Sequence, residues 1–508
     1  MGRPTQQDIF SGVVVFLVAL PLCLGIALAS GAPLFAGLIA GIIGGIVVGA
    51  ISNSQLGVSG PAAGLAVIVL TAIESLGGYQ TFLAAVVVAG LIQLVLGLLK
   101  AGIIGHFFPT SVIKGMLSGI GVIIVLKEIP HAVGYDKDYM GDLSFDQPDS
   151  ENTFSEFLVM LDYITPGAVA VSIGALLLII LWDQVLVKRF SVLKIAPGAL
   201  VAVIGGIIFT NAVNPDSLFA ITKEHLVSVP VTDDPKAFFS FFTLPKIADF
   251  AKMEVWTTGI LMAVIASLET LLSVEAIDKL DPKKRVTGKN LELLAQGTGN
   301  IVSGLIGGLP ITQVIVRSSA NVQSGGDSKR STIIHGFLLL ICIILIPVLL
   351  NMIPLAVLAS VLFIVGYKLA KPSLFKQMYK AGWEQFVPFI VTIAGVVFTD
   401  LLKGILMGLA VAIFIILRNS YRNSHFLHME EAGNGEKKIK MTLAEEVTFL
   451  NKGAVRHALD SLPSGSSLSI DMSKSFRIDP DVMEIINDFR ETSAERDISV
   501  ELISSAKP

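Results

Sequence analysis

The chain has few charged residues and almost no cysteine for its 508 residues. Only 15% of the residues are Asp, Glu, Lys or Arg, whereas soluble chains carry about 25%. The formal net charge of −4 gives no general attraction for phosphate backbones, so the composition does not indicate a nucleic-acid-binding protein. The two cysteines, Cys23 and Cys342, lie inside long apolar runs, which argues against a disulfide framework and a thiolate zinc site.

The sequence also lacks a P-loop, a zinc-spaced set of His and Cys residues, and a nucleophile motif. We therefore expect no enzyme, no cofactor, no resident metal and no use of ATP. Apolar residues are abundant instead, at 53% before the 47 glycines are counted. This composition predicts a membrane protein surrounded by the lipid bilayer.

Fourteen apolar segments are candidates to cross the bilayer, at about 20 residues per crossing. The first has no basic n-region beyond Arg3 and is followed at once by more apolar sequence, so we interpret it as a retained span rather than a signal peptide. The first seven segments are 9–29, 34–51, 58–73, 81–99, 110–129, 164–184 and 197–214. The second seven are 255–274, 289–307, 311–324, 332–350, 353–369, 386–400 and 401–418.

Charged residues in the loops indicate the orientation, because Lys and Arg in short loops concentrate on the cytoplasmic side. They follow the even-numbered segments: Lys188, Arg189, Lys194, Lys283, Lys284, Arg285, Lys289, Lys329, Arg330, Lys368, Lys371, Lys376, Lys380, Arg418 and Arg422. The loop after the fifth segment is acidic and should face outward: Asp136, Asp138, Asp142, Asp146, Asp149 and Glu151. This pattern predicts a multi-pass protein of the cell (inner) membrane with a cytoplasmic N-terminus.

The third segment of each half is too short to cross and begins at a Gly/Pro break. The breaks run from Gly57 to Pro61 and from Gly307 to Pro310. Short interrupted segments at matching positions in two halves indicate a transporter substrate site, and seven segments per half make the repeats inverted. The alternative is that Gly and Pro are simply common in membrane helices.

A helix that starts after an extended stretch leaves backbone N–H groups unpaired, and its macrodipole adds partial positive charge there. Two such starts meeting near the midplane would form a site for a small anion. We assign the following residues to this substrate site: Ser59, Gly60, Pro61, Ala62, Thr312, Gln313, Arg317 and Ser318. Arg317 is costly at this depth, so it either compensates a substrate charge or pairs with a distant acid.

Glu269 is the second intramembrane charge of interest, and Ser273 lies one turn later on the same helix face. Loss of water disfavours a charged carboxylate, so Glu269 would bind the coupling proton. The alternatives are that it holds Na⁺ together with Ser273, or forms a salt bridge with Arg317 or a lysine. Four other charged residues lie near segment ends, where we interpret them as snorkelling: Lys127, Glu128, Asp400 and Lys403. His335 starts a segment and is interpreted as interfacial.

The tail after the last segment has a different pattern, in which strands and helices alternate as in a small α/β domain. The predicted elements are strands at 439–442, 447–450, 467–472 and 498–503, and helices at 454–461 and 480–491. The loop charges place this tail in the cytoplasm. The predicted organisation is a first repeat at 1–214, an extracellular loop at 215–254, a second repeat at 255–418, a linker at 419–436 and the α/β domain at 437–508.

Several motifs resemble those of the sulfate permease (SulP) family of anion transporters. They are Ala19-Leu20-Pro21-Leu22, Gly57-Val58-Ser59-Gly60-Pro61, the block from Gly297 to Pro310, Arg317-Ser318-Ser319-Ala320-Asn321 and Ser324-Gly325-Gly326. The tail resembles the STAS domain of this family without its last helix. The resemblance implies a core domain that moves against a gate domain as an elevator, a homodimer, and third and tenth helices that face each other across the anion.

The resemblance also bears on coupling. Arg317-Ser318 matches the Arg-Ser pair of the family's tenth helix, and Glu269 matches a glutamate of plant sulfate/proton symporters. Cyanobacterial sodium/bicarbonate members carry aspartate and threonine at the positions of Glu269 and Ser273. We therefore predict a secondary active transporter of sulfate, bicarbonate or a dicarboxylate, coupled to protons through Glu269. The alternatives are sodium-coupled bicarbonate uptake, an uncoupled anion channel and a nucleobase transporter of the same architecture.

Overall fold

The computed structural model describes residues 5–137, 140, 145, 151–190, 193, 196–229, 241–431 and 437–504. The chain divides into two compact units, Met1–Leu409 and Ala410–Pro508. Some charged loop residues used above to predict the orientation lie outside the described residues: Asp138, Asp142, Asp146, Asp149 and Lys194.

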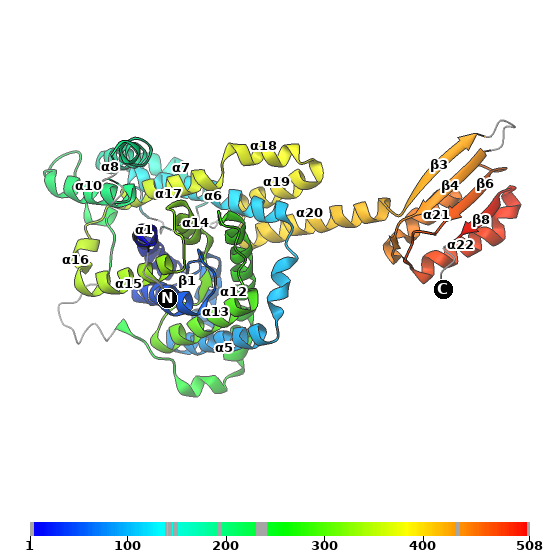
Figure 1. Cartoon of the computed structure of the whole chain (residues 1–508). Helices are drawn as coiled ribbons and strands as arrows, with labels where there is room; N and C mark the ends of the chain where they lie inside the picture. The colour runs from blue at the N-terminus through cyan, green and yellow to red at the C-terminus, as the bar shows by residue number, and fades with distance from the viewer. Residues whose placement is uncertain are drawn as a thin grey trace. The chain divides into compact units, whose positions relative to one another are not determined.

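The first unit consists mainly of helices, as the composition predicts (Figure 1). Its first half contains α1 (Gln6–Ala29), α2 (Leu34–Ile43), α3 (Gly49–Ile51), α4 (Ala66–Ser75), α5 (Tyr79–Leu98), α6 (Thr110–Val133), α7 (Glu156–Val159), α8 (Pro166–Leu181), α9 (Val187–Arg189) and α10 (Gly198–Ala212). Its second half contains α12 (Met253–Leu280), α13 (Lys289–Ile306), α14 (Ile315–Gln323), α15 (Arg330–Leu345), α16 (Pro347–Leu350), α17 (Leu355–Leu369), α18 (Pro372–Lys380), α19 (Trp383–Phe398) and α20 (Leu401–Arg422), which continues into the second unit.

Helices lie within all fourteen predicted segments. Among the described residues, seven helical stretches are long and apolar enough to cross a membrane: Gln6–Ala29, Leu34–Ile51, Tyr79–Leu98, Pro166–Arg189, Met253–Leu280, Leu355–Lys380 and Leu401–Arg422. Four shorter apolar helical stretches accompany them: Ala63–Ser75, Gly198–Ala212, Arg330–Leu345 and Trp383–Phe398. The protein is therefore a multi-pass membrane protein.

The end of the first predicted break and the three residues that follow the second form a short antiparallel pair of strands. Strand β1 (Ser59–Pro61) pairs with strand β2 (Ile311–Gln313), so that Ser59 lies opposite Gln313 and Pro61 opposite Ile311. After β1 the chain enters the 3₁₀ turn η2 (Ala63–Leu65) and then α4, and after β2 it enters α14 past one residue. The pairing therefore brings the starts of the two short helices together.

Glycines allow the backbones around these strands to approach closely. Gly44 lies in the π-helical turn η1 (Gly44–Val48), and a Cβ atom there would lie 2.3 Å from the carbonyl oxygen of Ser59. Gly307 ends α13 with φ +91°, a conformation that side chains other than glycine rarely adopt. The glycine-rich sequence at the breaks thus reflects both crowding and backbone conformation.

A buried side-chain amide forms hydrogen bonds with backbone groups of β2, which lie away from water. Oδ1 of Asn300 on α13 accepts from the N–H of Ile311 at 2.6 Å. Nδ2 of Asn300 donates to the carbonyl of Ile311 at 3.0 Å and to Oε1 of Gln93 at 2.7 Å. Helix α13 in turn lies along α5 (Figure 1), where Gly90 and Gly297 let the two backbones come close.

The second unit is a small α/β domain, as predicted. Its main sheet has the order β3-β4-β6-β8, with β3 antiparallel to β4 and the other pairs parallel. The elements are β3 (His425–Glu431), β4 (Lys437–Leu443), β5 (Glu446–Val447), α21 (Lys452–Asp460), β6 (Ser467–Asp471), β7 (Arg477–Ile478), α22 (Pro480–Thr492) and β8 (Ser499–Ile503). Short strands β5 and β7 pair with each other in a separate parallel ladder.

Two details of this unit differ from the sequence interpretation. Strand β3 lies in the stretch 419–436 that we assign to a linker, and it pairs with β4 along seven residues. Its large side chains Phe426 and Met429 are exposed, so no alternation of buried and exposed residues marks it. The strand predicted at 447–450 is shortened to β5, because Phe449–Asn451 forms a 3₁₀ turn capped by Thr448.

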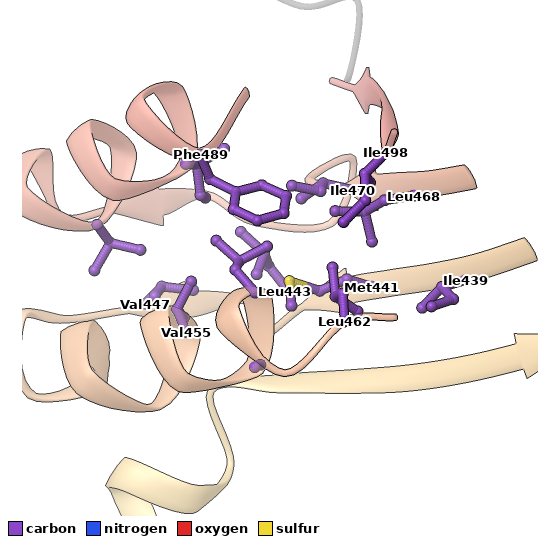
Figure 2. Close-up of a cluster of buried hydrophobic side chains, with 14 residues drawn as sticks. Ile439, Met441, Leu443, Val447, Val455, Leu462, Leu468, Ile470, Phe489 and Ile498 are labelled. Atoms are coloured by element: carbon purple, nitrogen blue, oxygen red, sulfur yellow. The ribbon is translucent and has the colours of Figure 1, made fainter. Parts of the chain in front are cut away.

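The core of the second unit lies between one face of the sheet and the two helices. The following residues form it: Ile439, Met441, Leu443, Val447, Val455, Ala458, Leu459, Leu462, Leu468, Ile470, Val482, Ile486, Phe489 and Ile498. Figure 2 shows Val455 of α21 and Phe489 of α22 directed toward the side chains of the strands. Alternate residues of β4 and β6 supply this core, as the period of a strand requires.

Candidate functional site

A cavity of about 70 Å³ lies at the starts of the two short helices. Its wall includes Pro61 of β1, Ala63 and Gly64 of η2, and the stretch Val314–Arg317 at the start of α14. The remaining wall comes from other helices: Leu22, Ile26, Ile120, Ile124, Glu128, Glu269, Leu362, Asp400 and Leu401. The cavity is large enough for a small ion and is mostly apolar.

Both short helices begin at this cavity, and no side chain among the described residues caps either start. Val314, which precedes α14, has extended backbone angles and makes no capping hydrogen bond. The start of η2 and the start of α4 also have no side-chain cap. The first turns therefore present backbone N–H groups and the positive ends of two helix dipoles. This arrangement favours a negative charge in the cavity.

Arg317 is the third residue of α14, and its side chain is only 1% exposed. Its guanidinium lies beside the thiol of Cys23, a weak acceptor that cannot neutralise the charge. Neither Nη1 nor Nη2 has a hydrogen-bond partner in the part of the chain that the structure describes. A buried guanidinium without an acid is costly, so its charge is available to an anion in the cavity.

Glu269 on α12 faces the same cavity from another side. A Cβ atom on Gly64 would lie 3.3 Å from each of its carboxylate oxygens, and Oε2 of Glu269 is buried without a partner. Ser273, one turn further along α12, lines an adjoining cavity of about 20 Å³ together with Glu269 and Gly64. Within the described residues no ion pair joins Glu269 to Arg317 or to a lysine.

The other residues that we assign to the substrate site hold the broken helices in place or lie in the ladder. Oγ of Ser59 accepts from Nε2 of Gln296 at 2.7 Å. Oγ of Ser318 accepts from the N–H of Val58 at 2.8 Å, which ties α14 to the chain before β1. Of the eight predicted residues, Pro61 and Arg317 line the cavity. The other six are buried around it: Ser59, Gly60, Ala62, Thr312, Gln313 and Ser318.

The interpretation of Lys127 and Glu128 as snorkelling residues is wrong, because both are buried, at 7% and 3% exposure. Glu128 faces the cavity, and its Oε2 has no hydrogen-bond partner among the described residues. The sequence did contain a signal for the burial of Glu128. Residues Ile120, Ile124 and Glu128 are four positions apart, which places all three on one face of α6. Asp400 does lie near the surface, where it pairs with Lys403 at 2.9 Å.

His335 is also not interfacial, because its side chain is fully buried. It lies on α15 where this helix crosses η1, and a Cβ atom on Gly45 would lie 2.6 Å from Gly336. This close crossing encloses the imidazole. Its Nδ1 lies 3.0 Å from the carbonyl oxygen of Thr332.

A second, wider cavity of about 580 Å³ lies toward the other end of α14. Ala320, one turn after Arg317, lines it together with Gln323 and Ser324. Its opposite walls come from α1, from the region of α8 to α10, and from α17. About one turn of α14 therefore separates this wide cavity from the small cavity at Arg317.

Comparisons with known proteins agree with this architecture. Residues 5–393 match the model of the sulfate permease family. The putative sulfate transporter YvdB of Bacillus subtilis is 27% identical over 413 residues, which cover 81% of this chain and 74% of YvdB. The bicarbonate transporter BicA of Picosynechococcus is 26% identical over 469 residues, which cover 91% of this chain and 78% of BicA.

The fold is also similar to that of a solved structure. Murine Solute Carrier 26 family member A9, an anion transporter solved in the inward-facing state, matches with a TM-score of 0.66 at 14% identity. The match covers 99% of this chain and 86% of the murine chain. The matched family and these relatives are transporters and not enzymes. Because residues 5–393 match the family model, this chain belongs to the sulfate permease family.

Proposed function

We propose that this protein is a secondary active transporter that carries a small anion across the cell membrane together with protons. The observation that carries the proposal is the buried guanidinium of Arg317, for which the described part of the chain supplies no acid partner, at a cavity where two short helices begin. A bound anion would supply the missing negative charge. Sulfate, bicarbonate and dicarboxylates all meet this requirement, and the names of the two relatives support the first two.

Proton coupling is assigned to Glu269, which shares the cavity with Arg317. A charged carboxylate on the wall would repel the anion and would itself lack water. Binding of a proton to Glu269 removes both costs at the moment when the anion enters. This link between the two events is what a symporter needs.

The proposed topology has fourteen spans in two inverted repeats of seven, with the N-terminus and the tail in the cytoplasm. Helices that overlap all fourteen predicted segments, and the ladder formed at the two matching breaks by β1 and β2, support it. We assign the tail as a STAS domain, and the alternation of strands and helices in the second unit supports this assignment. We further propose an elevator motion of a core domain against a gate domain, in a homodimer.

Sodium-coupled bicarbonate uptake is the second candidate function. It is favoured by the small cavity that Glu269 and Ser273 line together, where their oxygens would hold Na⁺. The name of the relative BicA also points to bicarbonate as a substrate.

Uptake into proteoliposomes tests these proposals. Labelled sulfate, bicarbonate and fumarate are offered to the purified protein under an imposed pH gradient or Na⁺ gradient. We expect one of the anions to accumulate when protons flow inward, and Arg317→Ala to abolish this uptake. The matched control is Lys380→Ala, which removes an exposed positive charge. Uptake by Arg317→Ala at the wild-type rate would contradict the site assignment, and uptake that follows only Na⁺ would favour the second candidate.

A further inference from the structure

Two buried groups and one partly buried histidine form a hydrogen-bonded cluster at the end of α6. Nδ1 of His131 lies 2.7 Å from Oδ1 of Asp136, and Nδ1 of His225 lies 2.7 Å from Oδ2 of the same carboxylate. His131 and Asp136 are each 4% exposed, whereas His225 is 17% exposed. The cluster therefore runs from a buried histidine, through a buried carboxylate, to a histidine that water reaches.

The end of α6 is shaped to bring Asp136 back over His131. Gly134 adopts φ +87°, and the N–H of Tyr135 donates to the carbonyl of Pro130 at 2.9 Å. This geometry is a Schellman-type helix end, which reverses the chain after the last turn. A Cβ atom on Gly134 would lie 2.7 Å from Cβ of Thr165, so only glycine fits this turn.

Glu128 connects this cluster to the anion cavity. It lies one turn before His131 on α6, and it is on the cavity wall with Arg317 and Glu269. The charged and titratable groups near Glu128 come from several elements. The charges of His131, Asp136 and Glu156 act on it, and Arg317, Glu269 and Asp400 share the cavity wall with it. Of the acids on the cavity wall, Asp400 has Lys403 as its partner.

The charges on the cavity wall do not balance when Glu128 and Glu269 are both ionised. Arg317 supplies one positive charge, while Glu128 and Glu269 supply two negative charges. In this state the cavity repels an anion, because charges around one small cavity interact strongly where water is scarce. Binding of one proton neutralises only one of the two carboxylates, and the second must also be neutralised before Arg317 is free to act on the substrate.

We propose that Glu128 is a second proton-binding carboxylate of the anion cavity, and that His225, Asp136 and His131 pass protons to it from the water at the outer end of α6. One proton enters at His225 and one leaves from His131 to Glu128, so each relay group returns to its starting charge. The assignment rests on the proposed function for its role in transport, but protonation of Glu128 is measurable without transport.

The state of Asp136 is consistent with a relay. Burial alone would raise the pKa of Asp136, but the hydrogen bonds from His131 and His225 outweigh this effect and hold the pKa below its usual value. The carboxylate therefore stays charged and keeps both histidines in hydrogen-bond contact. A proton crosses when Asp136 briefly accepts it from Nδ1 of His225 and, after the carboxyl group turns, gives it to the unprotonated Nδ1 of His131.

Infrared spectroscopy of the purified protein tests whether Glu128 binds a proton. Protonated carboxylic acids have a separate carbonyl band, which disappears as each acid loses its proton on raising the pH. We expect Glu128→Gln to remove one component of this pH-dependent band and Glu269→Gln to remove a different one. The matched control is Glu384→Gln, which alters an exposed glutamate and should leave these components in place. A spectrum of Glu128→Gln identical to that of the wild type would overturn the proposal.

A pH jump on the same sample tests the relay. We expect His225→Gln and Asp136→Asn to keep the Glu128 component but to slow its response roughly 100-fold, as loss of a positioned proton donor does. A lower melting temperature with an unchanged rate would show that the cluster only holds the loop in place, and would overturn the relay. The wild-type protein can show the expected infrared bands and still take up no anion. That result would count against the proposed function and not against Glu128 as a proton-binding site.

Discussion

Gly60 in β1 lies so close to Arg317 in α14 that a Cβ atom on Gly60 would come within 2.2 Å of Nη1. Glycine at this position is what leaves room for the guanidinium beside the ladder. We predict that Gly60→Ala displaces Arg317 and weakens anion binding by about tenfold or more, equivalent to about 1.4 kcal/mol. Calorimetric titration of the purified protein with the transported anion measures this change.

Gly174→Ala is the matched control for this substitution, because a Cβ atom at Gly174 in α8 would meet no atom within 4 Å. Its affinity should equal that of the wild type. Equal affinities for Gly60→Ala and Gly174→Ala would show that the position of the guanidinium does not matter for binding.

Arg317→Met should separate stability from binding. The substitution keeps much of the side-chain length and removes a buried charge for which the structure describes no acid partner. We expect the anion-free protein to become more stable, by about 1–4 kcal/mol, because a desolvated charge is lost. Anion binding should be abolished at the same time. A thermal unfolding series with and without the anion measures both effects, and a less stable variant would indicate a structural role for Arg317.

Glu269→Gln should uncouple anion uptake from protons. The amide has nearly the shape of the protonated carboxyl group but cannot release a proton, so uptake should no longer respond to an inward pH gradient. Exchange of labelled anion across the membrane should continue, because the neutral side chain imitates the loaded state. Proteoliposome uptake at several external pH values measures this, and a pH response like that of the wild type would remove Glu269 from the coupling mechanism.

Leu468→Ala should destabilise the second unit by roughly 2–5 kcal/mol, because Leu468 is fully buried in the core shown in Figure 2. Urea unfolding of a fragment that starts at Ala410 measures the loss. Phe476→Ala removes a larger side chain that is 76% exposed, and we expect it to change the stability by about 0.5 kcal/mol or less. A large effect at Phe476 would mean that this surface is covered in the fragment.

Asp471 should make the stability of the second unit depend on pH. Hydrogen bonds from Lys440, at 2.8 Å, and from the hydroxyl and N–H of Ser473 hold the pKa of Asp471 well below its usual value. A carboxyl group with a lowered pKa in the folded state stabilises it above the unfolded pKa of about 3.9, and loses this effect as the pH falls through the folded pKa. Asp471→Asn should therefore be less stable than the wild type at pH 7, and the difference should shrink in acid. A stability difference between the two proteins that does not change with pH would show that the lowered pKa of Asp471 is not its cause.

Some features of the candidate site could be predicted because they are local in the sequence. The two Gly/Pro breaks, the unusual depth of Arg317 and the family motifs can each be recognised in a few consecutive residues, and the family match confirms the resemblance that they indicate. The pairing of Ser59 with Gln313 could not be predicted, because strands of three residues carry no period and their partners lie in opposite halves of the chain. Lengths and compositions alone do not reveal such a contact.

Glu128 was misinterpreted for a different reason. It follows Lys127 near the end of a predicted segment, and two adjacent opposite charges there are typical of a membrane surface. Helix α6 extends four residues beyond the predicted end, to Val133, which moves both side chains into the protein. Strand β3 was missed because its exposed side chains lack the alternation that marks a half-buried strand.

The ladder between β1 and β2 has a consequence for how the anion can be exposed first on one side of the membrane and then on the other. Hydrogen bonds between the strands, and the bond from Val58 to Ser318, join the two halves of the cavity wall across the repeats. Opening the wall between these halves would leave backbone groups unpaired in a dry environment. For the proposed transport we therefore expect the two half-sites to travel as one piece, with alternating exposure arising from sliding against helices outside this piece rather than from parting the strands.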